Sequence, residues 1–144
     1  MDAIEMLKKE HAGATEAMEA IVKSPAAKMK ALFDALSKDL EIHDHIEETI
    51  FYPAIAANPK AAAFPALDKA AHREVEEALA KLKTLPVESK DWIPAFKAMQ
   101  SKLLKHISDE ETKFFVAIRG VLTATELGTL GEKMASGKKT LAKA

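Results

Sequence analysis

Two pairs of side chains suited to metal binding stand out in the sequence, each with a histidine four residues before a glutamate. The first pair is His43 and Glu47, and the second is His106 and Glu110. Residues four positions apart lie on one face of an α-helix, about 5–6 Å apart at Cβ, so an imidazole and a carboxylate can reach the same ion. Each pair is followed by two adjacent aromatic residues. This repeat predicts a metal site built on two helices.

Two more histidines, His11 and His72, lie in stripes of apolar residues with helical spacing. Apolar residues recur three and four positions apart around both, which predicts that both face the interior. His11 alone would be interpreted as a buried structural histidine bonded to a backbone carbonyl. Four inward histidines together favour a metal site. The fifth, His45, is two residues from His43 and is expected to point away from the site.

The helices that must position these residues follow from composition and periodicity. The chain has 144 residues, 48% of them hydrophobic, and only five glycines, which suits one all-α domain. We predict an antiparallel up-down-up-down four-helix bundle with a short C-terminal fifth helix. The bundle is expected over about residues 2–122, the short helix over about 124–136, and a frayed basic tail over 137–144. Capping-box patterns at Asp2 with Glu5 and at Thr123 with Glu126 predict two of the helix starts.

Composition also excludes several classes of site and partner. The absence of cysteine excludes disulfides, thiolate-ligated metal and a cysteine nucleophile. A formal net charge of −1 gives no reason to expect nucleic acid or acidic lipid as a partner. No signal peptide or membrane-spanning stretch is evident, so we expect a cytoplasmic protein without a membrane partner. The sequence does not indicate a protein partner.

Burial of two carboxylates needs a compensating charge. Pairing Glu47 and Glu110 with protonated histidines would require two buried ion pairs, which are poor stabilisers. Metal ions neutralise the carboxylates while the histidines bind as neutral ligands. Six nitrogen and oxygen ligands exceed the need of one tetrahedral zinc, and they suit two ions of iron, manganese or zinc that share two carboxylates. The predicted metal ligands are His11, His43, Glu47, His72, His106 and Glu110.

The pattern of His11, His43-x3-Glu47-Glu48, His72 and His106-x3-Glu110-Glu111 resembles the hemerythrin-like family, the cation-binding domains with a His/His/Glu signature. The resemblance covers nearly the whole chain. It implies two non-heme iron ions with an oxo or hydroxo bridge as the cofactor, ahead of zinc or manganese. It also implies that His11 and His43 bind one iron, that His72 and His106 bind the other, and that Glu47 and Glu110 bridge them.

One position departs from the oxygen-carrying hemerythrins, which have two histidines one turn apart on the third helix. Here the second of those positions is Glu76. Either Glu76 becomes a ligand, or one iron is less saturated and more open. Both alternatives argue against simple reversible oxygen carriage.

Two functions are expected from such a centre. The first is binding of, or reaction with, a small oxidant (dioxygen, peroxide or nitric oxide), with catalase-like or peroxidase-like turnover as one form of it. The alternative is a non-catalytic module that binds or senses oxygen or iron at the same di-iron site. A zinc or manganese protein with the same ligand arrangement is a third interpretation.

Overall fold

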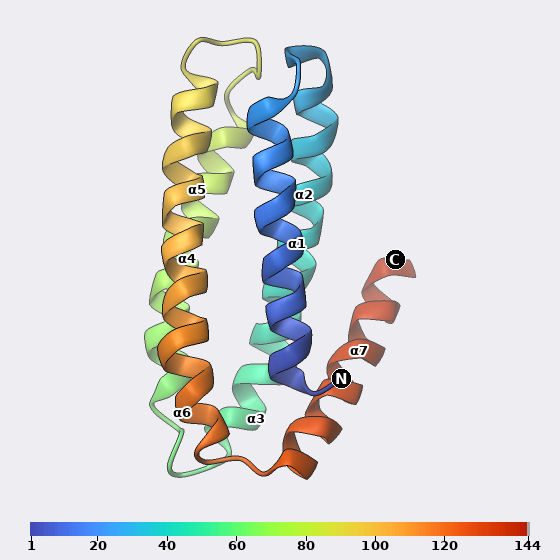
Figure 1. The fold of residues 1–144 in the computed structure, drawn as a ribbon, viewed down its shortest axis with the longest axis vertical. Coiled ribbons are helices and arrows are strands. Elements are labelled where there is room, and N and C mark those ends of the chain that lie inside the picture. The colour runs from blue at the N-terminus through green and yellow to red at the C-terminus, as the bar shows by residue number, and fades with distance from the viewer. Residues whose placement is uncertain (144) are drawn as a thin grey trace.

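The computed structural model describes residues 1–143, and all of their regular structure is helical. Four helical arms form an antiparallel bundle, and a fifth helix lies outside it (Figure 1). The predicted fold class is therefore confirmed. In chain order the elements are α1 (Ala3–Lys23), α2 (Ala26–Ile46), the π-helix η1 (Glu47–Phe51), α3 (Tyr52–Ala56), α4 (Phe64–Lys83), α5 (Trp92–Asp109), the π-helix η2 (Glu110–Phe114), α6 (Phe115–Arg119) and α7 (Ala124–Lys143).

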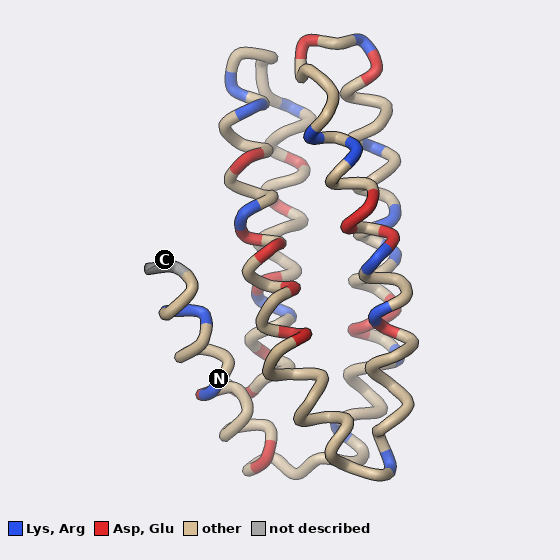
Figure 2. Tube along the Cα trace, turned by 180° about the vertical axis from the view of Figure 1, so that it is seen from behind, with Lys and Arg blue, Asp and Glu red and all other residues tan. Residues whose placement is uncertain are grey.

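Two observations describe the outside of the bundle. Lys and Arg positions alternate with Asp and Glu positions along the arms (Figure 2). Within residues 1–143, no helix combines the length and the apolar character needed to cross a membrane.

Both predicted capping boxes are present, since Asp2 and Glu5 exchange hydrogen bonds at the start of α1 and Thr123 and Glu126 do so at the start of α7.

The second and fourth arms each contain one π-helical turn that begins at a predicted metal ligand. The N–H of Tyr52 bonds to the carbonyl of Glu47, and the N–H of Phe115 bonds to that of Glu110, five residues back in each case. Pro53 follows the first turn, but no proline follows the second, so proline is not what requires this geometry. Single π-turns of this kind occur frequently at functional sites.

Two apolar clusters fill the bundle above and below the predicted ligands. One cluster surrounds Trp92, which stacks on Phe96 at 5.1 Å between ring centroids and meets the edge of Phe33. The other joins the start of α1 to the ends of the second and fourth arms and to α7, and includes Ile4 and Phe115. The predicted ligands therefore lie in a polar layer between two well-packed regions.

The fifth helix is longer than predicted. The expected end near residue 136 and the expected frayed tail are wrong for the described residues, because α7 continues to Lys143. Gly137 does not end the helix, and its missing side chain lets α7 lie close to Ile46 and Ile50. A Cβ there would lie 2.7 Å from Ile50 Cδ1. Residue 144, the end of the predicted tail, lies outside the described residues.

A close approach between α7 and the N-terminus of α1 yields a first prediction. A Cβ at Gly131 would lie 2.6 Å from the Met1 carbonyl oxygen and 2.8 Å from the Ala3 nitrogen. We expect Gly131→Ala to push α7 away and lower the free energy of unfolding by about 1–3 kcal/mol in urea titrations. Gly128→Ala, one turn earlier in open space, is the matched control and should stabilise by about 0.5–1 kcal/mol. Equal effects at both positions would contradict this packing.

Candidate metal centre

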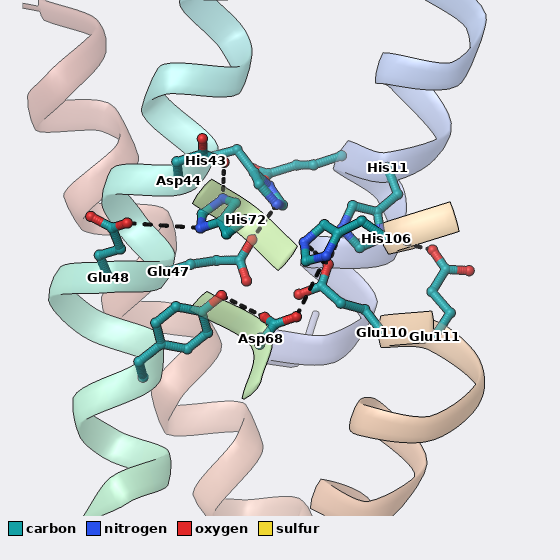
Figure 3. Close-up of polar contacts among 12 residues, drawn as sticks. His11, His43, Asp44, Glu47, Glu48, Asp68, His72, His106, Glu110 and Glu111 are labelled. Atoms are coloured by element: carbon teal, nitrogen blue, oxygen red, sulfur yellow. Dashed lines mark hydrogen bonds and ion pairs between the residues drawn. The ribbon is translucent and has the colours of Figure 1, made fainter. Parts of the chain in front are cut away.

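Three of the four arms bring four of the predicted ligands into one group. His11 on α1, His43 on α2, Glu47 on η1 and Glu110 on η2 each offer a nitrogen or oxygen within 4.8 Å of the others. All four side chains are buried, and Glu47 is fully inaccessible to solvent. Figure 3 shows these side chains converging between the arms. The i, i+4 spacing of His43 and Glu47 has the effect predicted from the sequence, since both face the same point.

The inward atoms form close ion pairs, but their geometry is not that of hydrogen bonds. His43 Nε2 lies 2.5 Å from Glu47 Oε1, and His11 Nε2 lies 3.1 Å from Glu110 Oε1. Both carboxylate oxygens of Glu47 and of Glu110 are nevertheless buried without a hydrogen-bond partner, and so is His106 Nε2. Buried polar atoms are rarely left unpaired. These inward atoms lie close together, are not aligned for hydrogen bonds with one another, and face a common centre.

Two carboxylates hold the imidazole rings from outside. Nδ1 of His11 donates to Glu111 Oε2 at 2.8 Å, and Nδ1 of His43 donates to Glu10 Oε1 at 2.6 Å. A carboxylate on the outer nitrogen leaves Nε2 free as a neutral metal-binding atom and fixes the ring orientation. The other oxygen of Glu10 accepts from Lys138 on α7 at 2.7 Å, which links the fifth helix to the site.

A second group shares Glu110 with the first. It consists of Asp68, His106 and Glu110, all buried, with ligand atoms within 4.8 Å of one another. Asp68 is not among the ligands predicted from the sequence, although it lies in the inward stripe four residues before His72. The Tyr52 hydroxyl donates to Asp68 Oδ2 at 2.5 Å. Asp68 therefore adds a carboxylate from the third arm to the second group.

His72 and Glu76 lie apart from both groups. Nε2 of His72 bonds to Asp44 on α2, and the three residues Asp44, His72 and Glu76 form a grouping of their own. The His72 ring still stacks on that of His106, with centroids 5.6 Å apart. His45 is exposed, as its position on the helix predicted. The two adjoining groups thus contain all of the predicted metal ligands except His72.

The chain matches the family model of the hemerythrin HHE cation-binding domain over residues 2–118. This chain belongs to the hemerythrin HHE family. It is 30% identical over 139 residues to the proteins Rv2633c of Mycobacterium tuberculosis and Mb2666c of Mycobacterium bovis, covering 94% of this chain and 84% of each relative. The crystal structure of an HHE cation-binding domain-containing protein from Mycobacterium kansasii superposes with a TM-score of 0.88. It shares 31% identity, and the match covers 98% of this chain and 87% of that one.

The electrostatics of this HHE domain suit a cation. Burial raises the pKa of Glu110 well above its usual range, and the charge of Glu47 raises it further. Burial would also raise the pKa of Glu47, but the neighbouring His43 lowers it. Burial would lower the pKa of His43, yet Glu47 and Glu10 raise it to about 10. Without metal, protons on the cluster therefore neutralise the carboxylates, and a bound cation would take over that role.

The other imidazoles of the two groups, those of His11 and His106, favour the neutral form. Burial lowers the pKa of both His11 and His106, and neutral imidazole is the form that binds metal. The chain is therefore an HHE cation-binding domain with a His/Glu cluster that could bind metal. The buried inward atoms without hydrogen-bond partners show that these residues fit a bound metal ion.

Proposed function

We propose that this chain holds two iron ions in the His/Glu cluster and uses them to bind, or react with, a small oxidant such as dioxygen, peroxide or nitric oxide. The observation that carries the proposal is the set of buried, unpartnered carboxylate oxygens of Glu47 and Glu110, surrounded by inward imidazole nitrogens. Two adjoining donor groups that share Glu110 favour two ions over one.

The donor set favours iron among the metals considered. It contains only nitrogen and oxygen, the ligand types typical of non-heme iron centres on helical bundles. The second group offers three protein donors, fewer than the four of a closed structural zinc site. When bound, iron supplies a change of oxidation state and an open coordination position for a small molecule.

A cavity beside the imidazoles gives a small ligand room. Its volume is about 590 Å³, and it reaches all four inward histidines. The rest of its lining is mostly apolar and includes Leu36, Leu40, Val75 and Leu103, together with the charged residues Lys9, Glu10, Asp39, Asp44, Glu132 and Lys138. On the other side, the buried ring of Phe115 stacks on His11 at 5.9 Å between centroids and excludes water. An aliphatic approach of this kind suits a small molecule with little or no charge.

Tyr52 can hold a proton beside the centre. Its hydroxyl is bonded to Asp68, and burial together with the charge of Glu47 raises its pKa, so the hydroxyl keeps its proton at neutral pH. We expect Tyr52→Phe to retain iron but to slow a peroxide reaction by about 100-fold, the lower end of the range for a lost proton donor. Iron content and turnover of the variant check this. Loss of iron would instead mean that Tyr52 serves to hold Asp68 in place.

One experiment separates binding from reaction. Reduced, iron-loaded protein is mixed with dioxygen, nitric oxide or hydrogen peroxide, and the optical spectrum and evolved oxygen are followed. Steady conversion of two hydrogen peroxide molecules into two waters and one dioxygen indicates an enzyme. One spectral change that reverses when the gas is removed indicates a carrier or sensor. No response from protein that contains iron would contradict the proposal.

A further inference from the structure

Lys138 on α7 is the outermost member of a row of polar contacts that ends at the buried cluster. Its Nζ donates to Glu10 Oε2 at 2.7 Å, and the other oxygen of Glu10 accepts from His43 Nδ1 at 2.6 Å. His43 Nε2 in turn lies 2.5 Å from Glu47 Oε1. The Lys138 side chain is 47% exposed, whereas those of Glu10 and His43 are 14% and 10% exposed. A surface cation is thus connected to an inward imidazole through one buried carboxylate.

The packing of α7 sets the position of Lys138. This helix lies beside α1 and α2 (Figure 1). Met134, one turn before Lys138, is fully buried in the apolar cluster that joins α7 to the start of α1. Gly137, the residue before Lys138, lets the backbone of α7 lie close to Ile50. These contacts hold the backbone of α7 where the Lys138 side chain can bond to Glu10.

Only one imidazole of the first group has this additional support. His11 Nδ1 donates to Glu111 at 2.8 Å, much as His43 Nδ1 donates to Glu10. The Glu111 side chain is 32% exposed, and no lysine or arginine among the described side chains pairs with it. Lys138 therefore distinguishes the surroundings of His43 from those of His11.

A cation bonded to Glu10 can act on the centre in two ways that have opposite signs. As a positive charge, Lys138 repels a metal ion and weakens its binding. As a donor, it fixes the rotation of the carboxylate, because each oxygen of Glu10 then has its own partner. Partners that orient a metal-binding imidazole typically change metal affinity by about 10- to 100-fold. An ion pair with an exposed lysine adds little to stability, so orientation is the effect that the geometry favours.

We propose that Lys138 is a positioning residue for the metal centre, which acts through Glu10 to fix the His43 ring with Nε2 facing the ion. The matched family model ends at residue 118 and α7 begins at Ala124, so this contribution comes from outside the matched HHE region. Fixing His43 in this way concerns any cation in the cluster and requires neither iron nor an oxidant. It can therefore hold even if the proposed function fails.

The first test measures the Co²⁺ affinity of the metal-free, full-length chain by the optical absorption of bound Co²⁺. We expect Lys138→Met to bind Co²⁺ about tenfold more weakly, at the lower end of the range for such partners. Lys138→Arg, which keeps a donor for Glu10, should restore the wild-type affinity. Lys139→Met, an exposed neighbour on α7, is the matched control and should bind like the wild type. Equal or tighter binding by Lys138→Met would overturn the proposal, because a lysine that acts only by its charge strengthens metal binding when it is removed.

The second test determines whether Lys138 acts through Glu10. In a Glu10→Gln background the ion pair with Lys138 is already lost, so adding Lys138→Met should cause no further loss of Co²⁺ affinity. A further tenfold loss in that background would overturn the proposal, since it would mean that Lys138 acts by holding α7 in place.

The third test needs no metal. The hydrogen bond from His43 Nδ1 to Glu10 should give a downfield proton resonance in the NMR spectrum of the metal-free chain, identified by its loss from His43→Ala. We expect Lys138→Met to broaden this resonance through faster exchange with water, and Lys138→Arg and Lys139→Met to retain it. Its absence from the wild-type spectrum, or its persistence unchanged in Lys138→Met, would contradict a fixed His43 ring. Failure of the proposed function would instead appear as iron-loaded protein that does not respond to an oxidant.

Discussion

Replacing Glu110 with alanine is expected to remove metal from both positions of the buried centre. Glu110 is the residue common to the two groups of ligand atoms, so its loss leaves three donors in the first group and two in the second. Its neighbours His11 and His106 would also lose the carboxylate oxygen that lies 3.1 Å and 3.4 Å from their Nε2 atoms. Metal analysis of purified protein measures the effect.

The control for this variant is His45→Ala, which removes an imidazole from the exposed side of the same layer and should leave metal content unchanged. Retention of one ion per chain by Glu110→Ala would contradict a shared ligand. Loss of metal from His45→Ala would contradict the facing of α2 in the structure. Glu47→Ala adds a finer test. Loss of both ions would support the bridging role expected from the sequence, and loss of one would restrict Glu47 to the first group.

Removing the metal from the wild-type protein is expected to lower its stability by several kcal/mol. Binding to the folded state alone stabilises it by mass action, by about 4 kcal/mol at a free metal concentration a thousand times Kd. The structural reason is that the carboxylate oxygens of Glu47 and Glu110 are buried without hydrogen-bond partners, and a bound cation would supply partners for them. Urea or thermal unfolding of iron-loaded and chelator-treated protein measures the difference, and the melting temperature should fall by roughly 10 °C.

Glu110→Ala supplies the comparison for this stability effect. Its unfolding should be the same with and without added iron, because the variant is expected to hold no ion in the centre. Equal stability of loaded and stripped wild-type protein would show that the cluster does not depend on metal. An iron-dependent gain in Glu110→Ala as large as that of the wild type would place the stabilising ion elsewhere.

The sequence predicted the parts of the site that depend on spacing within one helix. His43 with Glu47 and His106 with Glu110 share a face because four residues make about one helical turn. The inward apolar stripes of the first and third helices likewise placed His11 and His72 in the interior, where both are buried. The family resemblance agreed with this pattern, and the matched family model covers residues 2–118.

What the sequence did not predict depends on contacts between helices. Glu10 supports His43 from another arm, and no spacing within α1 points to that contact. The close approach of α7 to Ile46 and Ile50 of the second arm at Gly137 is likewise a contact that no spacing within α7 indicates. Asp68 lies one turn before His72 and could be recognised from the sequence as a candidate ligand, whereas the missing fifth histidine of the oxygen carriers corresponds to a position one turn after His72, at Glu76. The π-turns at Glu47 and Glu110 carry no known sequence signal here.

The direction of the His72 ring was also beyond prediction. His11 and His72 are each followed by apolar residues three, seven and ten positions later. Yet His11 turns Nε2 toward Glu110, whereas His72 turns Nε2 toward Asp44 on α2 and Nδ1 toward Glu48 on η1. The difference arises because Asp44 lies within reach of His72. The shared spacing therefore predicted that both rings are buried, but it did not predict which residues they contact.

The central claim is tested most directly by counting metal ions per chain in protein produced with iron, together with its Mössbauer spectrum. We expect two irons per chain in two non-heme sites, as the two groups that share Glu110 require. Zinc in their place, or fewer than two metal ions per chain after loading with iron, would contradict the di-iron centre and leave only the helical bundle.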